Sequence, residues 1–319
     1  MFDVITIGSA FRDTFLFINP KDAPVIDNPE KDPTREKLIT FEFGAKIDID
    51  ESCLAVGGGG VNTAVTFARA GLKCASVVSI GIDEAGRMIE NVFKKEKINK
   101  KFITKHTDQS TGFSTLIVAG KEKKDRVILI ERGASDELNF SPSARSISKT
   151  KWYYLTALSG DYLEKELSDI FSVVQKKQIK IAWNPGSKQL KAGVSSLSKY
   201  MKYCEIFIVN LDEAIELVGG KKDMDCLLSS LISKGPRRVI ISNGIDGVYY
   251  ADKNQKMHIK ANKSIKAKEP TGAGDSLGSG IVASLIRNPC DIKGALEYGI
   301  RNSESVVQEI GAQEGIIYV

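Results

Sequence analysis

Over the second half of the chain, short apolar runs alternate with longer segments whose apolar residues have helical spacing. The runs are Trp152–Leu155, Ile179–Trp183, Ile206–Val209 and Arg238–Ser242. Phe2–Gly8 and Cys74–Ile80 have the same character nearer the N-terminus. Strands that alternate with helices are typical of a parallel sheet covered on both faces, with right-handed crossovers. The pattern therefore predicts an α/β fold with a mostly parallel central sheet.

Two segments depart from this pattern. Residues 14–52 begin with a loop that carries four prolines between Pro20 and Pro33, and alternating residues follow at Leu38–Phe43 and Ile47–Ile49. Residues 102–131 contain the similar runs Phe102–Lys105, Phe113–Val118 and Arg126–Ile130. Such short alternating runs favour exposed strands. We expect 14–52 and 102–131 to form a small separate sheet, and 1–13, 53–101 and 132–319 to form the core. The sequence assigns no role to the Pro20–Pro33 loop.

Composition narrows the function classes. The 319 residues are 42% hydrophobic and 27% charged with a net charge of +5, which is ordinary for a globular protein and does not indicate nucleic-acid binding. No apolar run reaches the roughly 18 residues of a membrane span, and the N-terminus does not resemble a signal peptide. The five cysteines are scattered, which favours reduced thiols in the cytoplasm. The two histidines are isolated, which argues against histidine catalysis or ligation.

A glycine-rich turn, Gly272-Ala273-Gly274, precedes Asp275 and an apolar run with helical spacing. A helix that starts there would expose backbone N–H groups and its positive dipole end, which together bind anions. A carboxylate beside an anion site suits a general base that takes a proton from a hydroxyl during phosphoryl transfer. The alternative is purely structural, because acids in a first helical turn complement the dipole and glycines allow close packing.

A second glycine run, Gly57–Gly60, precedes Asn62 and an amphipathic segment that ends at Gly71. It would bring backbone close to a ligand, and an asparagine suits a pair of hydroxyls; a flexible linker is the alternative. Polar residues also follow the predicted strands, where ligands of open α/β sheets collect. Asp13 follows the first, and Asn210 and Glu213 follow another with capping-box spacing, which alone would explain them.

The string Glu-Pro-Thr-Gly-Ala-Gly-Asp at 269–275 resembles the Asp-x-Thr-Gly-Ala-Gly-Asp signature of the ribokinase-like (phosphofructokinase B) carbohydrate kinases, with Glu269 in place of the first aspartate. The run from Gly57 to Asn62 resembles the Gly-Gly-x-Gly-x-Asn signature of that family, and Gly81–Gly86 resembles its Gly-x-Asp-x-x-Gly. The resemblance covers essentially the whole chain. It implies a ribokinase-like three-layer α/β/α sandwich in which 14–52 and 102–131 form a β lid over the sugar site.

The resemblance also implies roles for individual residues. Asp275 becomes the catalytic base, and Gly272, Ala273 and Gly274 become the anion hole. The residues expected to bind the sugar are Asp13, Gly58, Gly59, Gly60 and Asn62. Glu213 is expected to order magnesium through water, and the nucleotide is expected at Asn210, Ser242, Asn243, Gly244, Gly247, Thr271 and Asn302. The implied reaction transfers the γ-phosphate of ATP to a sugar hydroxyl with Mg²⁺. The resemblance also allows K⁺ as a further cofactor and a homodimer that forms through the lid.

Three alternatives remain. Ribokinases proper carry a glutamate after the strand that corresponds to Trp152–Leu155, but residues 155–159 read Leu-Thr-Ala-Leu-Ser, so ribose is in doubt and a nucleoside or sugar-phosphate kinase is the first alternative. A substrate phosphate would find cations at Arg12, Lys46 and Arg132. A Rossmann-type NAD-dependent oxidoreductase is disfavoured because no glycine fingerprint follows the first strand. A non-catalytic sugar sensor would have no need of Asp275.

Overall fold

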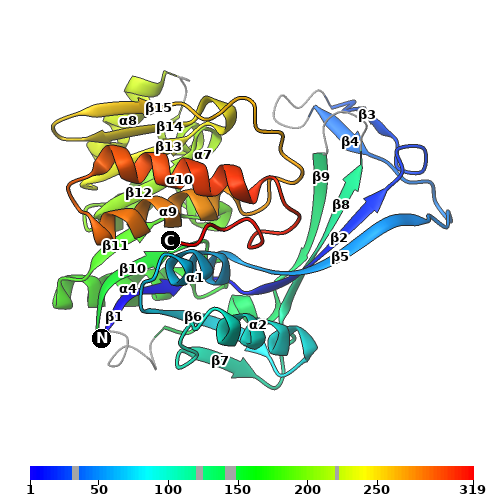
Figure 1. Ribbon diagram of the computed structural model, residues 1–319, viewed down its shortest axis with the longest axis horizontal. Helices are drawn as coiled ribbons and strands as arrows, with labels where there is room; N and C mark the ends of the chain where they lie inside the picture. The colour runs from blue at the N-terminus through cyan, green and yellow to red at the C-terminus, as the bar shows by residue number, and fades with distance from the viewer. Residues whose placement is uncertain (31–35, 120–124, 141–148, 220–222) are drawn as a thin grey trace.

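The computed structural model describes residues 1–30, 36–119, 125–140, 149–219 and 223–319. A nine-stranded sheet forms its centre, in the order β15-β14-β13-β12-β11-β10-β1-β6-β7 (Figure 1). The strands of this sheet are β1 (Phe2–Ile7), β6 (Cys74–Gly81), β7 (Ile103–His106), β10 (Thr150–Leu155), β11 (Lys180–Trp183), β12 (Ile206–Asn210), β13 (Arg238–Ser242), β14 (Val248–Asp252) and β15 (Lys256–Ile259). Neighbours from β13 to β7 are parallel, and β14 and β15 add an antiparallel edge. The predicted mostly parallel sheet is confirmed.

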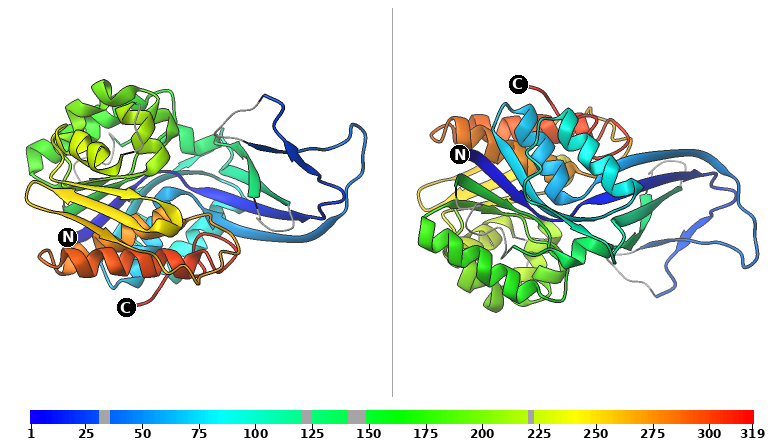
Figure 2. Two further views of the ribbon diagram at one scale, coloured as in Figure 1. Left: turned by 90° about the horizontal axis from the view of Figure 1, so that it is seen from above. Right: turned by 90° about the horizontal axis from the view of Figure 1, so that it is seen from below.

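Helices cover both faces of this sheet, so the molecule has three layers (Figure 2). Successive strand residues point to opposite faces. In β1, Val4 packs into the core on one face and Ile5 into the core on the other. On the Val4 face lie α1 (Gly59–Arg69), α2 (Glu84–Lys95), α9 (Ala273–Arg287) and α10 (Ile292–Val306); on the Ile5 face lie α4 (Leu163–Lys177), α5 (Ser187–Leu190), α6 (Gly193–Met201), α7 (Leu211–Val218) and α8 (Met224–Ile232).

A second sheet projects from the core (Figure 1). Its order is β5-β2-β8-β9, with β2 at Phe11–Ile18, β5 at Ile49–Gly57, β8 at Gly112–Ala119 and β9 at Asp125–Glu131. In β8, buried residues alternate with half-buried ones, as expected for a sheet with one covered face. The short strands β3 (Val25–Asp27) and β4 (Lys37–Ile39) pair at its far end. We call β5-β2-β8-β9 the lid sheet.

The predicted bounds and strands of the lid sheet need corrections. Residues 11–13 and 53–57 were expected in the core, but β2 begins at Phe11 and β5 continues to Gly57, so they belong to the lid sheet. Ile103 pairs with Val78 of β6, so the expectation that Phe102–Lys105 belongs to the lid is wrong. The neighbouring Phe102 is 3% exposed and contacts the ring of Phe2, which ties this segment to the core. The strand expected at Leu38–Phe43 ends at Ile39, and Phe43 is fully exposed, because its alternation has no partner strand to pack on. Pro33 lies outside the described residues.

Two short 3-10 helices complete the description. Gly133–Glu137 leads from the lid sheet back to the core, and Gly244–Asp246 joins β13 to β14. Ser135 in the first of them binds both backbone groups of Ala10: its hydroxyl accepts from the amide at 3.2 Å and donates to the carbonyl at 2.9 Å. The chain passes from β1 into the lid through this point, so the root of the lid is fixed to the core.

Candidate active site

The turn before α9 has the geometry that its glycines predict. Gly272 is the N-cap, with φ of +82°, and no side chain caps the helix. A β-carbon at Gly272 would lie 2.5 Å from the β-carbon of Ala312, so glycine is required there on two counts. The amides of Gly274 and Asp275 lie in the first turn, where a helix provides no acceptors of its own. They are available to an anion at the positive end of α9.

This turn forms one wall of an open cavity of about 270 Å³. The cavity lies at the carboxyl ends of β11, β12 and β13, where ligands of open α/β sheets bind. Its lining residues are Arg126, Ile128, Asn184, Ile208, Val209, Asn210, Glu213, Ser242, Pro270, Thr271, Gly272, Ala273, Gly274, Asp275 and Leu277. Arg126 and Ile128 come from β9, so the lid sheet contributes to this cavity as well as the core.

Asp275 is half-buried in this wall. Its Oδ2 accepts a hydrogen bond of 2.9 Å from the side-chain amide of Asn62. Burial raises the pKa of Asp275, and the hydrogen bond from Asn62 opposes that rise. A carboxylate with a raised pKa is a stronger proton acceptor, which suits a general base.

Asn62 is itself held by the protein. It is 4% exposed, and its Oδ1 accepts a hydrogen bond of 2.9 Å from Nε2 of Gln313. Nε2 of Gln313 also donates to the carbonyl of Val56 at 2.8 Å. A direct sugar contact for Asn62 stays a prediction, because its amide is engaged with Asp275 and Gln313.

Asp13 lies in β2 on the covered face of the lid sheet and is 7% exposed. Its pKa is raised to about 6: burial is the main cause, a hydrogen bond of 2.6 Å from the hydroxyl of Ser114 opposes the rise, and the nearby charges of Glu269 and Asp275 contribute to it. Glu269 and Asp275 therefore both lie within electrostatic reach of Asp13. The position of Asp13 beside Asp275 suits a substrate ligand next to the reacting hydroxyl.

The glycine run brings the start of α1 against the turn between β1 and β2. Gly58 has φ of +94°, and a β-carbon there would lie 2.5 Å from the carbonyl oxygen of Ser9. The amide of Gly60 donates to the same carbonyl at 3.0 Å, and the amide of Gly59 donates to the Ser9 hydroxyl at 3.2 Å. These contacts explain the glycines structurally. A sugar contact through Gly58, Gly59 or Gly60 stays a prediction.

Sequence reasoning did not identify Arg126. Its Nε lies 3.1 Å from Oε1 of Glu269, which is 1% exposed. Glu269 also accepts from the amide of Thr271 at 2.9 Å and from its hydroxyl at 2.7 Å, so it shapes the turn before Gly272. The ion pair joins the lid sheet to that turn. The only local signal was a single cation at the head of the apolar run Val127–Ile130.

The residues predicted to bind nucleotide separate into three groups. Asn210, Ser242 and Thr271 line the cavity. Asn243, Gly244 and Gly247 form the turn between β13 and β14, and the amide of Asn243 donates to the carbonyl of Gly247. Asn302 must be corrected, because it is fully buried in α10 and is occupied by two backbone groups: its amide donates to the carbonyl of Ser276 at 2.9 Å, and its Oδ1 accepts from the amide of Ile317 at 3.0 Å.

Glu213 and Asn210 form a reciprocal capping box at the start of α7. The carboxylate of Glu213 accepts from the amide of Asn210, and the side chain of Asn210 accepts from the amide of Glu213, each at 2.8 Å. Burial raises the pKa of Glu213. Within the described part of the chain, no group of three or more His, Cys, Asp or Glu side chains could hold a metal by itself. A Mg²⁺ ion here would therefore depend on phosphate oxygens and water for most of its ligands.

The cations considered for a substrate phosphate lie elsewhere. Lys46 is exposed, Arg132 donates to the hydroxyl of Ser159 at 3.0 Å, and Arg12 lies 5.8 Å from the centre of the Phe113 ring. None of the three lines the cavity beside Asp275. No helix in the described ranges has the length and apolarity needed to span a bilayer.

Comparison with known proteins agrees with this geometry. Residues 33–317 match the pfkB family carbohydrate kinases. A ribokinase of Staphylococcus aureus (strain COL) is 27% identical over 287 residues, which cover 86% of this chain and 89% of the relative. The structure of Arabidopsis thaliana ribokinase complexed with ribose and ATP superposes with a TM-score of 0.80 at 14% identity, covering 99% of this chain and 96% of the other.

A Methanocaldococcus jannaschii nucleoside kinase of the ribokinase family superposes with a TM-score of 0.75 at 17% identity, covering 99% of this chain and 95% of the other. These likenesses establish the ribokinase fold, and the family match establishes the reaction class. The chain belongs to the pfkB family of carbohydrate kinases. It is a phosphotransferase with a hydroxyl group as acceptor, and its substrate is a sugar or a nucleoside.

Proposed function

We propose that the protein transfers the γ-phosphate of ATP to a hydroxyl of a sugar, with Asp275 as the base. The observation that carries this proposal is the position of Asp275. It stands in the first turn of α9, in the cavity wall, with one oxygen held by Asn62. The hydroxyl would give its proton to Asp275 while its oxygen attacks the γ-phosphorus and the bond to ADP breaks. Positioning and charge stabilisation provide most of the rate enhancement in such reactions.

The remaining residues would orient the reactants and stabilise charge. Asp13 accepts hydrogen bonds from sugar hydroxyls on the lid side of Asp275. The amides of Gly274 and Asp275 and the dipole of α9 stabilise the negative charge on the transferring group. The amide of Ala273, which was expected to share this role, donates to the carbonyl of Pro270 at 3.2 Å. Arg126 adds a cation at the cavity wall, 3.1 Å from Glu269, from which its guanidinium can turn to a phosphate oxygen.

The nucleotide would occupy the part of the cavity near Asn210, Ser242 and Thr271, and Mg²⁺ would bind between its phosphates and water molecules ordered by Glu213. The metal neutralises charge on the phosphates when it is bound. The proposal includes K⁺ as a further cofactor. The ATP assignment is supported by the cavity lining and by the ATP that the Arabidopsis thaliana ribokinase structure contains. The Mg²⁺ assignment is supported by the ATP and Mg²⁺ in the structure of an E. coli ribokinase II, which has the same fold.

We further propose that the lid sheet covers the sugar site, as a domain distinct from the core, and that two lids pair in a homodimer. The outer face of the sheet supports this pairing. The register places Leu54, Thr14, Thr115 and Leu129 in one row, and Leu54 and Leu129 are 59% and 55% exposed. Exposed leucines at both ends of a row on the outer face of a sheet suit an interaction surface. The buried thiols Cys74 and Cys204 suit a reducing compartment, so we place the protein in the cytoplasm.

A substrate panel with a matched variant tests the function. ADP formation would be measured with ribose, deoxyribose, fructose and inosine, for the wild type and for Asp275→Asn. Loss of a general base typically costs 10²–10⁴-fold, so we expect kcat to fall by about that factor on the best substrate. Melting temperature should change little, because a dipole-complementing aspartate contributes only about 0.3–1 kcal/mol. Near wild-type turnover by Asp275→Asn would rule out the mechanism.

The second candidate is a nucleoside kinase. It is favoured by the side chains after β10, where Thr156 and Ala157 stand in place of an acid. Without an acid at this position, the protein has one hydrogen-bond acceptor fewer for a sugar hydroxyl. A less polar substituent on the substrate would suit this position better. The same panel separates the two candidates, because kcat/KM for inosine would exceed that for every free sugar if the substrate is a nucleoside.

A further inference from the structure

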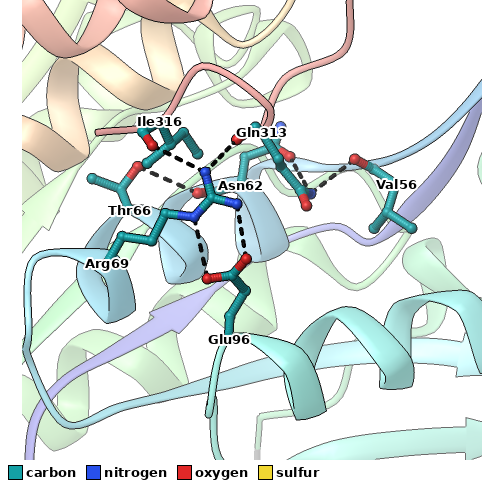
Figure 3. Close-up of polar contacts among 7 residues, drawn as sticks. All are labelled: Val56, Asn62, Thr66, Arg69, Glu96, Gln313 and Ile316. Carbon is teal, nitrogen blue, oxygen red and sulfur yellow. Dashed lines mark hydrogen bonds and ion pairs between the residues drawn. The ribbon is translucent and has the colours of Figure 1, made fainter. Parts of the chain in front are cut away.

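The segment that follows α10 passes directly behind Asp275 and its turn. Within it, Ala312 touches Gly272, and Gln313 holds Asn62 (Figure 3). Ala312 and Gln313 are both buried, at 1% and 8% exposure. One short stretch of backbone therefore contacts the anion-binding turn and, through Asn62, the proposed base. We call residues 311–316 the backing segment.

A buried ion pair anchors the backing segment. Arg69, at the end of α1, donates to the carbonyl of Gln313 at 2.7 Å and to that of Ile316 at 3.0 Å. Its other nitrogens donate to both oxygens of Glu96, at 3.1 and 2.8 Å, and both side chains are 6% exposed (Figure 3). The bidentate pair fixes the guanidinium, and the guanidinium fixes the backbone on either side of Gly315.

Gln313 then determines which way the amide of Asn62 faces. Nε2 of Gln313 can only donate, so the Asn62 atom that faces it must be the carbonyl oxygen, Oδ1. The amide nitrogen of Asn62 is thereby turned toward Oδ2 of Asp275. A flipped Asn62 would present oxygen to the carboxylate and nitrogen to a donor, and both contacts would be repulsive. Gln313 therefore excludes the arrangement in which Asp275 loses its hydrogen bond.

We propose that Gln313 is a positioning residue for the phosphoryl-transfer reaction, which holds the Asp275 carboxylate in its reactive orientation through Asn62. The inference rests on the proposed function, in which Asp275 is the base. With Oδ2 bound to Asn62, Oδ1 is left to receive the proton of the substrate hydroxyl. Arg69 and Glu96 support this arrangement from a distance, by fixing the backbone from which Gln313 extends.

The hydrogen bond from Asn62 also stabilises the ionised form of Asp275, because it lowers the pKa that burial raises. Without Gln313, Asn62 is free to rotate and this stabilisation weakens. The pKa of Asp275 should then rise, and the acidic limb of the pH–rate profile should move to higher pH. A change in general packing would lower stability or activity without moving that limb.

Two substitutions at Gln313 test the proposal. Gln313→Met keeps the length of the side chain and removes the donor. Gln313→Glu replaces the donor with an acceptor, which favours the flipped Asn62. The matched control is Gln308→Glu, which adds the same charge at an exposed position five residues earlier in the chain. For both Gln313 variants we expect kcat to fall by roughly 10–100-fold, less than for Asp275→Asn, with KM for ATP changed by less than about threefold.

The decisive measurements are the pH–rate profile and the titration of Asp275 by ¹³C NMR of aspartate-labelled protein, with Asp275→Asn to assign the resonance. We expect both Gln313 variants to raise the pKa of Asp275 by about one unit and Gln308→Glu to leave it unchanged. An unchanged pKa in folded Gln313→Met would overturn the proposal. The NMR titration needs no turnover: a raised pKa in a protein with no kinase activity would refute the proposed function, while still showing that Gln313 orients the Asp275 carboxylate.

Discussion

The charge of Asp13 suits sugar binding but lowers the stability of the folded protein. It is almost fully buried, and its pKa of about 6 lies well above the ordinary value of 3.8. Above pH 6 the folded protein must hold this carboxylate ionised in a poorly hydrated site. At neutral pH the charge therefore costs stability, and a sugar that donates hydrogen bonds to it would repay part of that cost.

The sign of this effect gives a prediction for Asp13→Asn. The folded pKa is raised, so wild-type stability falls as pH rises from about 4 to about 6 and then stays level. An asparagine has no such dependence. Asp13→Asn should therefore gain stability relative to the wild type as pH increases, by up to about 3 kcal/mol between pH 4 and pH 8, while sugar affinity falls. Melting curves at both pH values measure the gain.

The control for that experiment is Asp48→Asn, since Asp48 is an exposed aspartate near the tip of the lid. This substitution removes the same charge from the lid without changing a buried site, so we expect a smaller gain in stability than for Asp13→Asn. If Asp13→Asn behaves as this control does, Asp13 is hydrated in solution, and its assignment as a desolvated substrate ligand is wrong.

The sequence allowed residues to be identified wherever their neighbours in the chain determine their role. Asp275 could be placed at a helix start from the glycines before it and the apolar spacing after it. The partners of these residues could not be placed. Gln313 contacts Asn62 from 251 positions away in the chain. The ion pair of Arg126 with Glu269 joins strand β9 of the lid sheet to the turn before α9. Such contacts depend on tertiary packing and leave no local pattern.

At the scale of single elements, the two glycines of the turn before α9 have different surroundings. Gly272 has positive φ and lies against Ala312, whereas a β-carbon at Gly274 would meet no atom within 4 Å. The space around Gly274 is the cavity itself. Gly272 is therefore required by the fold, whereas Gly274 is required by the ligand that enters the cavity.

Alanine substitutions should separate these demands. Gly272→Ala introduces backbone strain and a steric overlap, so we expect it to lose about 1–3 kcal/mol of stability. Gly274→Ala should be as stable as the wild type or up to about 1 kcal/mol more stable, because alanine favours the helix. Its methyl group would occupy the anion site, so kcat/KM for ATP should drop. Thermal melting together with ATP kinetics checks both variants; a fully active Gly274→Ala would remove the anion site from this turn.

The start of α7 allows the two interpretations of Glu213 to be separated. Glutamine also completes a capping box, so Glu213→Gln should keep the helix and change stability by less than about 0.5 kcal/mol. If the carboxylate orders Mg²⁺ through water, the Mg²⁺ concentration needed for half-maximal rate should rise several-fold. Asn210→Ala provides the contrast, with a loss of about 1 kcal/mol from the missing cap. If the rate of Glu213→Gln depends on Mg²⁺ concentration as the wild type does, Glu213 has only its structural role in the capping box.

Element prediction succeeded where periodicity was long and failed at short strands. The alternation of strands and helices after Trp152 was sufficient to predict the parallel sheet. The four residues of β7 were assigned to the wrong sheet, because an alternating run of that length fits either one. The antiparallel strands β14 and β15 were missed although the run Val248–Ala251, with its valine and two tyrosines, has the composition of a strand and is largely buried.

At the scale of the whole molecule, the outer face of the lid sheet carries the exposed leucines on which the proposed lid dimer rests. The row that contains Leu54 and Leu129 would be buried if two lids pair. Sedimentation velocity should then show a dimer for the wild type and a monomer for Leu129→Glu, because burying an unpaired charge costs several kcal/mol. Ile82→Glu, at a position 64% exposed outside the lid, is the control and should leave the dimer intact. A monomeric wild type would refute the lid dimer.

The position of β1 affects how the chain folds. This strand lies inside the sheet, with Val4 opposite Cys74 on one side and Phe2 opposite Thr150 on the other. The β6 side can form within the first 81 residues, whereas the β10 side requires closure of a loop of more than 140 residues. Pairings this distant slow folding, and an apolar strand that waits with one open edge promotes aggregation. Refolding from denaturant should therefore be slow, with a yield that falls as protein concentration rises.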